Sequence, residues 1–140
     1  MMEGNQAAEF TRRQAGMLPG ELNIEWDEVA QGRAVGGFTA IKRHMAPNGF
    51  LHAASVIALA DSACGYACVA SLPDGASGFT TIELKANYLG TAKEGEEVAC
   101  EARLVHGGRM TQVWDAEVTN QTTGKTMALF RCTQMVLWPR

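Results

Sequence analysis

One acidic side chain stands in the middle of a stretch of apolar and small residues. The segment HAASVIALADSACGYACVASL covers residues 52–72, with the carboxylate of Asp61 nine positions after the imidazole of His52. A carboxylate among apolar residues is costly unless it is paired, hydrogen-bonded or exposed in a cleft. Burial also raises its pKa and strengthens it as a base. Asp61 is therefore a candidate general base or nucleophile; the alternative is a structural acid that bonds a backbone amide or faces a subunit interface.

The segment that carries Asp61 is expected to form one long helix, from about Ala53 to Ser71, stopped by the turn residues 72–75. It is apolar on nearly every side, so a curled sheet and a partner subunit should cover it. About 20 apolar residues are also enough to span a bilayer. The central Asp61, the Ala and Ser content and the lack of aromatic or basic flanks favour a buried helix instead.

Period-two alternation predicts strands on both sides of this helix. Before it, residues 22–42 are expected to form a hairpin, and Pro47, Asn48 and Gly49 demand a loop. After it, residues 78–90 alternate, which places Thr80 with Ile82 on the apolar face. Three more strands, separated by short connections, are expected within residues 96–108, 109–121 and 125–138. The pattern predicts an α+β fold, with a long central helix wrapped by a curved antiparallel sheet of about five to six strands.

Length, charge and cysteine spacing limit the domain organisation and the classes of partner to expect. A chain of 140 residues is typical of one domain; we expect an N-terminal arm at 1–20, with a short helix around 8–17 ended by Leu18-Pro19-Gly20, and a single domain at 21–140. The formal charge of −3 does not favour nucleic acid as a partner. The first residues contain no continuous apolar stretch, so a cytoplasmic protein is expected. The four cysteines lack metal-ligand spacing, and no metal is expected.

Three motifs together resemble a known family. They are Gly49-Phe-Leu-His52-Ala-Ala leading into Leu59-Ala-Asp61-Ser-Ala, Thr80-Thr-Ile-Glu-Leu-Lys-Ala-Asn-Tyr-Leu, and Val105-His-Gly-Gly-Arg109. Over about residues 20–137 the chain resembles hotdog-fold acyl-CoA thioesterases of the phenylacetate-degradation (PaaI-like) type. The resemblance implies an acyl-CoA substrate, no cofactor beyond the coenzyme A of the substrate, and a homodimer or a homotetramer built as a dimer of dimers. The chain departs from the family at Ala53-Ala54, where His-Gly-Gly is usual, and at Ala46, where the family has Asn.

The resemblance implies hydrolysis of an aryl or medium-chain acyl-CoA to free acid and coenzyme A, with Asp61 as general base or nucleophile. The Ala53 backbone N–H, at a helix N-terminus, is the expected oxyanion donor. His52 is expected near the thioester carbonyl or, as the alternative, in the helix cap. Thr81 matches the residue that helps to hold the water. Further substrate contacts are assigned to Asn48, Gly49, Ala54, Ser62, Thr80 and Arg109.

Two other functions stay open. The Ala53-Ala54 departure allows a non-catalytic acyl-CoA binding module. A hotdog hydratase or dehydratase is disfavoured, since His44-Met-Ala-Pro47 only superficially matches the His-Phe-Pro-Gly segment of that class. The coenzyme A phosphates would meet cations such as Lys85, Lys93, Arg109 and Arg131, whose alternative role is solvated surface. Candidate acyl-pocket residues are Phe50, Leu59, Tyr66 and Phe79, and Glu83 is expected to face solvent or form a salt bridge.

Overall fold

Six antiparallel strands form the sheet of this protein, in a computed structural model that describes residues 4–140. The spatial order is β1-β2-β4-β5-β6-β3, so the strand that follows the long helix becomes an edge of the sheet. The two early strands form the expected hairpin, and the four later strands form the rest of the sheet. The strands are β1 Glu25–Ala30, β2 Arg33–Thr39, β3 Gly78–Tyr88, β4 Glu97–Gly107, β5 Thr111–Asn120 and β6 Lys125–Leu137.

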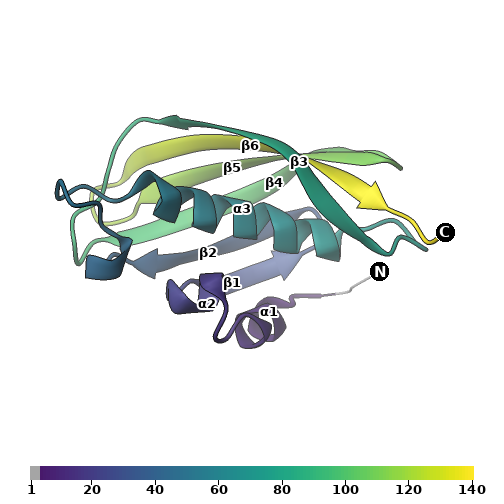
Figure 1. The fold of residues 1–140 in the computed structure, drawn as a ribbon, viewed down its shortest axis with the longest axis horizontal. Helices are drawn as coiled ribbons and strands as arrows, with labels where there is room; N and C mark the ends of the chain where they lie inside the picture. Colours follow the sequence, from purple (N-terminus) through teal and green to yellow (C-terminus); the bar gives the residue numbers. More distant parts are fainter. Residues whose placement is uncertain (1–3) are drawn as a thin grey trace.

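The long helix α3, Ala53–Ala70, lies along one face of the curved sheet (Figure 1) and contacts all six strands. Its small residues let the sheet approach closely: a Cβ at Gly65 would come within 3.2 Å of the Phe79 ring. Length and composition alone would let α3 cross a membrane, but more than half of it is buried inside the protein. Its apolar character therefore builds the core. One helix wrapped by a curved antiparallel sheet confirms the expected hotdog fold.

An N-terminal arm packs against β1 and α3. It contains α1, Ala7–Arg13, and α2, Leu18–Glu21, and a 3-10 turn, η1 Lys42–His44, follows β2. We expected Leu18-Pro19-Gly20 to end a helix, but α1 already ends at Arg13 and Pro19 lies in the first turn of α2. The fixed φ of proline suits that position.

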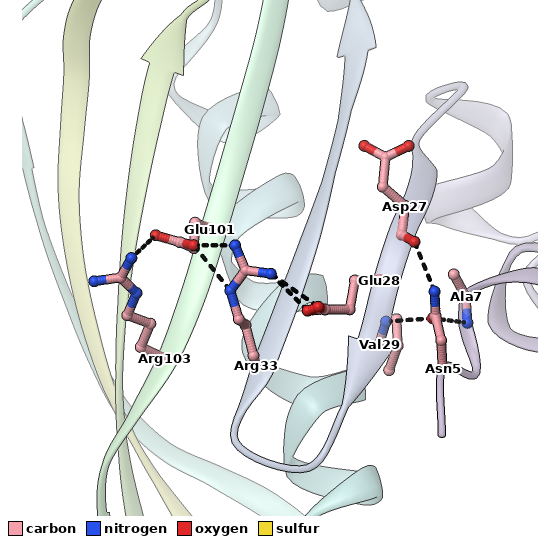
Figure 2. Close-up of polar contacts among 8 residues, drawn as sticks. All are labelled: Asn5, Ala7, Asp27, Glu28, Val29, Arg33, Glu101 and Arg103. Atoms are coloured by element: carbon pink, nitrogen blue, oxygen red, sulfur yellow. Dashed lines mark hydrogen bonds and ion pairs between the residues drawn. The ribbon is translucent and has the colours of Figure 1, made fainter. Parts of the chain in front are cut away.

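The Asn5 side chain ties the arm to β1 (Figure 2). Its Nδ2 donates to the Asp27 carbonyl at 2.9 Å, and its Oδ1 accepts from the amides of Ala7 and Val29 at 2.9 and 3.0 Å. The same view shows Arg33 between Glu28 and Glu101 on the outer face of the sheet. Exposed pairs of this kind contribute about 0–1 kcal/mol each. The Asn5 bonds and apolar contacts such as buried Phe10 thus help to hold the arm on the rest of the fold.

Strand β3 departs from strict alternation. Thr81 pairs with Gln134 and Glu83 pairs with Thr133, so Ile82 is an extra residue, a β-bulge. Paired residues of an antiparallel ladder share a face, and Gln134 is fully buried on the inner face. Thr81 therefore faces inward while Thr80 shares the outer face with exposed Met135. The expectation that Thr80 lies on the apolar face was wrong, because the bulge shifts the alternation by one residue.

Candidate active site

Asp61 lies in the middle of α3, where the helix passes over the inner face of the sheet. Its Oδ1 is buried and has no hydrogen-bond partner within the described residues. Desolvation by burial raises the pKa of the carboxyl, because a low-dielectric environment disfavours the charged form. No backbone amide of residues 4–140 satisfies Oδ1, which argues against the structural alternative of an acid that bonds one. A raised pKa and an oxygen without a hydrogen-bond partner are properties that suit a general base.

A pocket of about 480 Å³ opens beside this carboxylate, within the roughly 300–1,000 Å³ typical of ligand pockets. Helix α3, strand β3 and the N-terminal arm each contribute a wall. The lining is mostly apolar or aromatic and comes from Asp61, Ser62, Gly65, Tyr66, Val69, Phe79, Thr81, Phe10, Arg13, Gln14, Met17 and Pro19. The pocket therefore offers an apolar space next to one buried acid.

Two larger hollows lie elsewhere on the molecule, and neither contains Asp61. One, of about 640 Å³, borders β1, β2 and β4, and the other, of about 730 Å³, crosses the outer face of the sheet. The second holds Lys85 and Arg131, but Arg131 is paired with Asp115 at 2.5 Å. We place the site at the smaller pocket because only there does a buried acid meet an apolar wall.

Thr81 reaches the Asp61 pocket from β3. Its Oγ1 donates to Oε1 of Gln134 at 2.6 Å, and Gln134, on β6, is fully buried. The bulge at Ile82 makes this contact possible by turning Thr81 inward. One chain thus brings together three of the residues expected from sequence: Asp61, Ser62 and Thr81.

The start of α3 forms a separate group. His52 is the N-cap: its Nδ1 accepts the Ala54 N–H at 2.9 Å and its carbonyl accepts the Ser55 N–H at 2.9 Å. The amides of Ala54 and Ser55 are therefore both bonded, whereas the amide of Ala53, the first helical residue, has no acceptor in the described part of the chain. The cap role proposed as the alternative for His52 is therefore present, and it leaves the Ala53 N–H without an acceptor among the described residues.

The loop before α3 carries two more expected site residues. Asn48 Oδ1 accepts the Phe50 N–H at 3.1 Å, and Gly49 has a φ of +89°, a conformation that favours glycine. Asn48 and Gly49 therefore shape the loop that leads into the helix start.

The helix start and Asp61 are far apart within one chain. Asp61 is eight positions after Ala53, which corresponds to about 12 Å along a helix that rises about 1.5 Å per residue. Two other expected contacts also lie outside the pocket. Thr80 is on the outer face, and the Arg109 guanidinium lies 4.4 Å from the centre of the Trp138 ring. Glu83 is exposed, as expected, and accepts a hydrogen bond from Thr133 at 2.9 Å.

Of the four residues expected to form the acyl pocket, Tyr66 and Phe79 line it. Leu59 is fully buried in the core, and Phe50 is exposed in the loop before α3. Sequence reasoning missed the arm residues of the pocket, and it missed Gln134. A signal for Gln134 was present, because it occupies an inward position of β6 between buried Cys132 and Val136.

The amino-acid sequence is similar to those of several known thioester hydrolases. The chain is 30% identical over 112 residues to the 1,4-dihydroxy-2-naphthoyl-CoA hydrolase of Listeria monocytogenes, covering 80% of this chain and 89% of that protein. It is 30% identical over 110 residues to the acyl-coenzyme A thioesterase PaaI of Escherichia coli, covering 79% of this chain and 75% of that protein.

Solved structures agree with these relatives. The structure of E. coli PaaI, from the phenylacetic acid degradation operon, matches with a TM-score of 0.83 and 25% identity, over 94% of this chain and 91% of that one. A Streptococcus mutans protein bound to acetyl CoA matches with a TM-score of 0.76 and 25% identity, over 84% and 91% of the two chains. Residues 48–127, from the loop before α3 into β6, match the thioesterase superfamily. The fold, the buried acid and these matches together show that the chain belongs to the thioesterase superfamily, a family of thioester hydrolases.

Proposed function

We propose that this thioesterase hydrolyses an aryl or medium-chain acyl-CoA to the free acid and coenzyme A, with Asp61 as general base. The observation that carries the proposal is the half-buried Asp61 carboxylate, whose Oδ1 is buried without a hydrogen-bond partner in the described residues, in an apolar pocket that Thr81 also lines. The raised pKa of Asp61 brings its basicity closer to neutral pH, which suits proton transfer from water.

The proposed reaction begins when a water oxygen attacks the thioester carbonyl carbon and Asp61 takes one proton from that water. The carbonyl oxygen becomes an oxyanion, which the Ala53 N–H stabilises with the positive end of the helix dipole. The intermediate then collapses, the C–S bond breaks, and the thiolate of coenzyme A receives the proton from Asp61. The products are one carboxylic acid and one free thiol.

Asp61 as nucleophile is the alternative path, through a mixed anhydride that water later opens. The Thr81 hydroxyl in the same pocket favours the general-base path, because it offers a second contact for a water. Single turnover in ¹⁸O-labelled water separates the two paths. Label in the Asp61 carboxylate would establish the anhydride path with water attack at Cγ of Asp61, because the general-base path puts the label only in the acid product.

The proposed site requires two subunits. The oxyanion donor must lie about 3 Å from the carbonyl oxygen, and the base must reach the water that attacks the same carbonyl carbon, but Ala53 and Asp61 are about 12 Å apart along α3. We therefore propose that the amide of one subunit serves the Asp61 of its partner. The edge strand β3, with exposed Ile82, Leu84 and Tyr88, supports a second copy of this chain as its partner. A homotetramer would consist of two such dimers.

A complementation experiment tests this two-subunit site. Ala53→Pro removes the N–H at the first helical position, which accepts proline, and His52 already has the extended conformation that precedes proline, at φ −66° and ψ 134°. Both Asp61→Asn and Ala53→Pro should be inactive as homodimers. If equal amounts are mixed and exchange subunits, half of the dimers are mixed and each holds one intact site of two, which gives about a quarter of wild-type activity. Activity that stays at the level of the separate variants would contradict a shared site.

The acyl group is tested by release of free coenzyme A from a panel of thioesters, for wild type and Asp61→Asn side by side. The panel should begin with aromatic thioesters, because Tyr66, Phe79 and Phe10 line the pocket and a relative is named a 1,4-dihydroxy-2-naphthoyl-CoA hydrolase. Turnover that disappears in Asp61→Asn supports the proposal and identifies the acyl class. Saturable binding of acyl-CoA without turnover would favour the binding module instead.

A further inference from the structure

Two buried polar atoms lack partners near the Thr81 hydroxyl. Among the buried side-chain nitrogen and oxygen atoms of residues 4–140, the atoms without a hydrogen bond are Asp61 Oδ1 and Gln134 Nε2. A buried polar group without a hydrogen bond destabilises the fold because it loses its bond to water, so each such group in a native protein requires an explanation. Here one atom is an acceptor and the other is a donor, so one small ligand can satisfy both.

Thr81 connects the two groups. Its Oγ1 donates to Gln134 Oε1 at 2.6 Å, and its side chain lines the same pocket as Asp61. Helix α3 and strand β6 also meet close by, because Cys64, one helical turn after Asp61, interacts with Cys132, two residues before Gln134 on β6. Thr81 thus lies between the pocket that it lines with Asp61 and the buried side chain of Gln134.

We propose that Gln134 positions the hydrolytic water, an inference that rests on the thioesterase reaction proposed above. The single hydroxyl hydrogen of Thr81 is committed to Gln134, so the lone pairs of Thr81 Oγ1 are left to accept a hydrogen from water. The other hydrogen of that water points to Asp61 Oδ1, and Gln134 Nε2 donates to one water lone pair. These three bonds fill three of the four tetrahedral directions of the water. The fourth, a lone pair, is free to attack the thioester carbon.

Gln112 provides a matched control. It lies directly opposite Gln134 in the ladder, on β5, and is almost as deeply buried. Both ends of its amide are occupied: Oε1 accepts the Trp114 N–H at 2.8 Å and Nε2 donates to the Ser71 carbonyl at 3.0 Å. Gln112 is therefore a buried amide with a structural role, one strand away from the proposed water site.

The test measures kcat and KM, per mole of folded enzyme, for Gln134→Leu, Gln134→Met, Thr81→Val, the double variant Thr81→Val/Gln134→Leu, and Gln112→Leu. Loss of water alignment should lower kcat by about 100-fold in Gln134→Leu, with KM nearly unchanged because the acyl group still binds. The double variant should lose no more than the more damaged single variant, since both residues act on one water. Gln112→Leu should lose stability and keep its kcat.

A kcat of Gln134→Leu within twofold of wild type, or losses that multiply in the double variant, would overturn the inference. Gln134→Met keeps an unbranched side chain of similar length. If the leucine variant does not fold, the kcat of the methionine variant tests the inference in the same way. The parent proposal fails separately: it fails if wild type releases no coenzyme A or if Asp61→Asn keeps full turnover. Active wild type, inactive Asp61→Asn and normal Gln134 variants would refute only the role of Gln134.

Discussion

Two regions of the interior treat buried polar side chains in opposite ways. Under the N-terminal arm, Gln14 is fully bonded: its Oε1 accepts from Trp26 Nε1 and the Tyr66 hydroxyl, both at 3.0 Å, and its Nε2 donates to the Ile24 carbonyl at 2.5 Å. Beside Thr81, an oxygen of Asp61 and a nitrogen of Gln134 have no partner in the described part of the protein. The satisfied amide joins elements of the fold, whereas the two unsatisfied groups lie where we propose that a reactant binds.

The turn before α3 belongs to the first kind of region. His44 is buried; its Nδ1 accepts the Ile41 N–H at 3.0 Å and its Nε2 donates to the Leu22 carbonyl at 2.6 Å. Its carbonyl accepts the Ser55 hydroxyl at 2.8 Å, which anchors the start of the helix. Burial is the main cause that lowers the pKa of His44. Both ring nitrogens are thus used in structure, and His44 is not a catalytic acid of the dehydratase kind.

The largest effect expected from this contrast is the loss of activity in Asp61→Asn. Asparagine keeps the size of the side chain but cannot take a proton, so kcat should fall by about 100- to 10,000-fold. Release of coenzyme A with a thiol reagent measures the loss, and circular dichroism confirms that the variant is folded. Wild-type turnover in the folded variant would remove Asp61 from the mechanism.

The next largest effect is a loss of stability when the hydrogen bonds of Gln14 under the N-terminal arm are removed. Gln14→Leu leaves the Trp26 N–H, the Tyr66 hydroxyl and the Ile24 carbonyl without their partner, which should lower the free energy of unfolding by about 3 kcal/mol. Tyr66→Phe removes only one of these bonds and should cost about 1 kcal/mol. Urea denaturation of the three proteins gives the values. Equal midpoints for Gln14→Leu and wild type would show that the network does not stabilise the arm.

The dependence of kcat/KM on pH tests whether Asp61 acts as the base. Because burial raises the pKa of Asp61, the active carboxylate form should be lost at a higher pH than for an exposed aspartate. Below that pKa, kcat/KM should fall about tenfold per pH unit, since one proton inactivates the base. The profile is measured with a substrate whose own groups do not titrate in this range. A flat acid limb down to the ordinary range of aspartate would contradict a desolvated base.

Much of the architecture can be predicted from sequence because it depends on periodicity. The expected helix over 53–71 compares with Ala53–Ala70 in the structure, and both the hairpin and the later strands are present. The bulge at Ile82 cannot be predicted this way, because nothing in the alternation marks an extra residue. The docking of the arm is also missed, since it depends on long-range bonds of Asn5 and Gln14 rather than on a local pattern.

The ionised Asp61 carboxylate should also lower the stability of the folded protein. A raised pKa means that the folded protein binds this proton more tightly than the unfolded chain does. The stabilising contribution of the protonated form is complete below the unfolded pKa and is lost as pH rises through the folded pKa. Asp61→Asn should therefore unfold at a higher temperature than wild type at neutral pH, by a small margin because solvent reaches this half-buried group. Calorimetry at neutral and acidic pH should show this gain shrinking as the wild-type carboxylate becomes protonated.

The smallest effect is expected at the helix start, where Ala53 replaces the glycine usual in the resembled family. Ala53→Gly keeps the N–H and removes only a methyl group beside the proposed oxyanion, so kcat should stay the same or rise by about twofold, well under 1 kcal/mol of barrier. Glycine at this position should also lower stability by at most about 1 kcal/mol. Steady-state kinetics beside Ala53→Pro separates the methyl group from the N–H. A large loss of kcat in the folded glycine variant would mean that the methyl group packs against the bound thioester, and that this end of the site depends on shape as well as on the free amide.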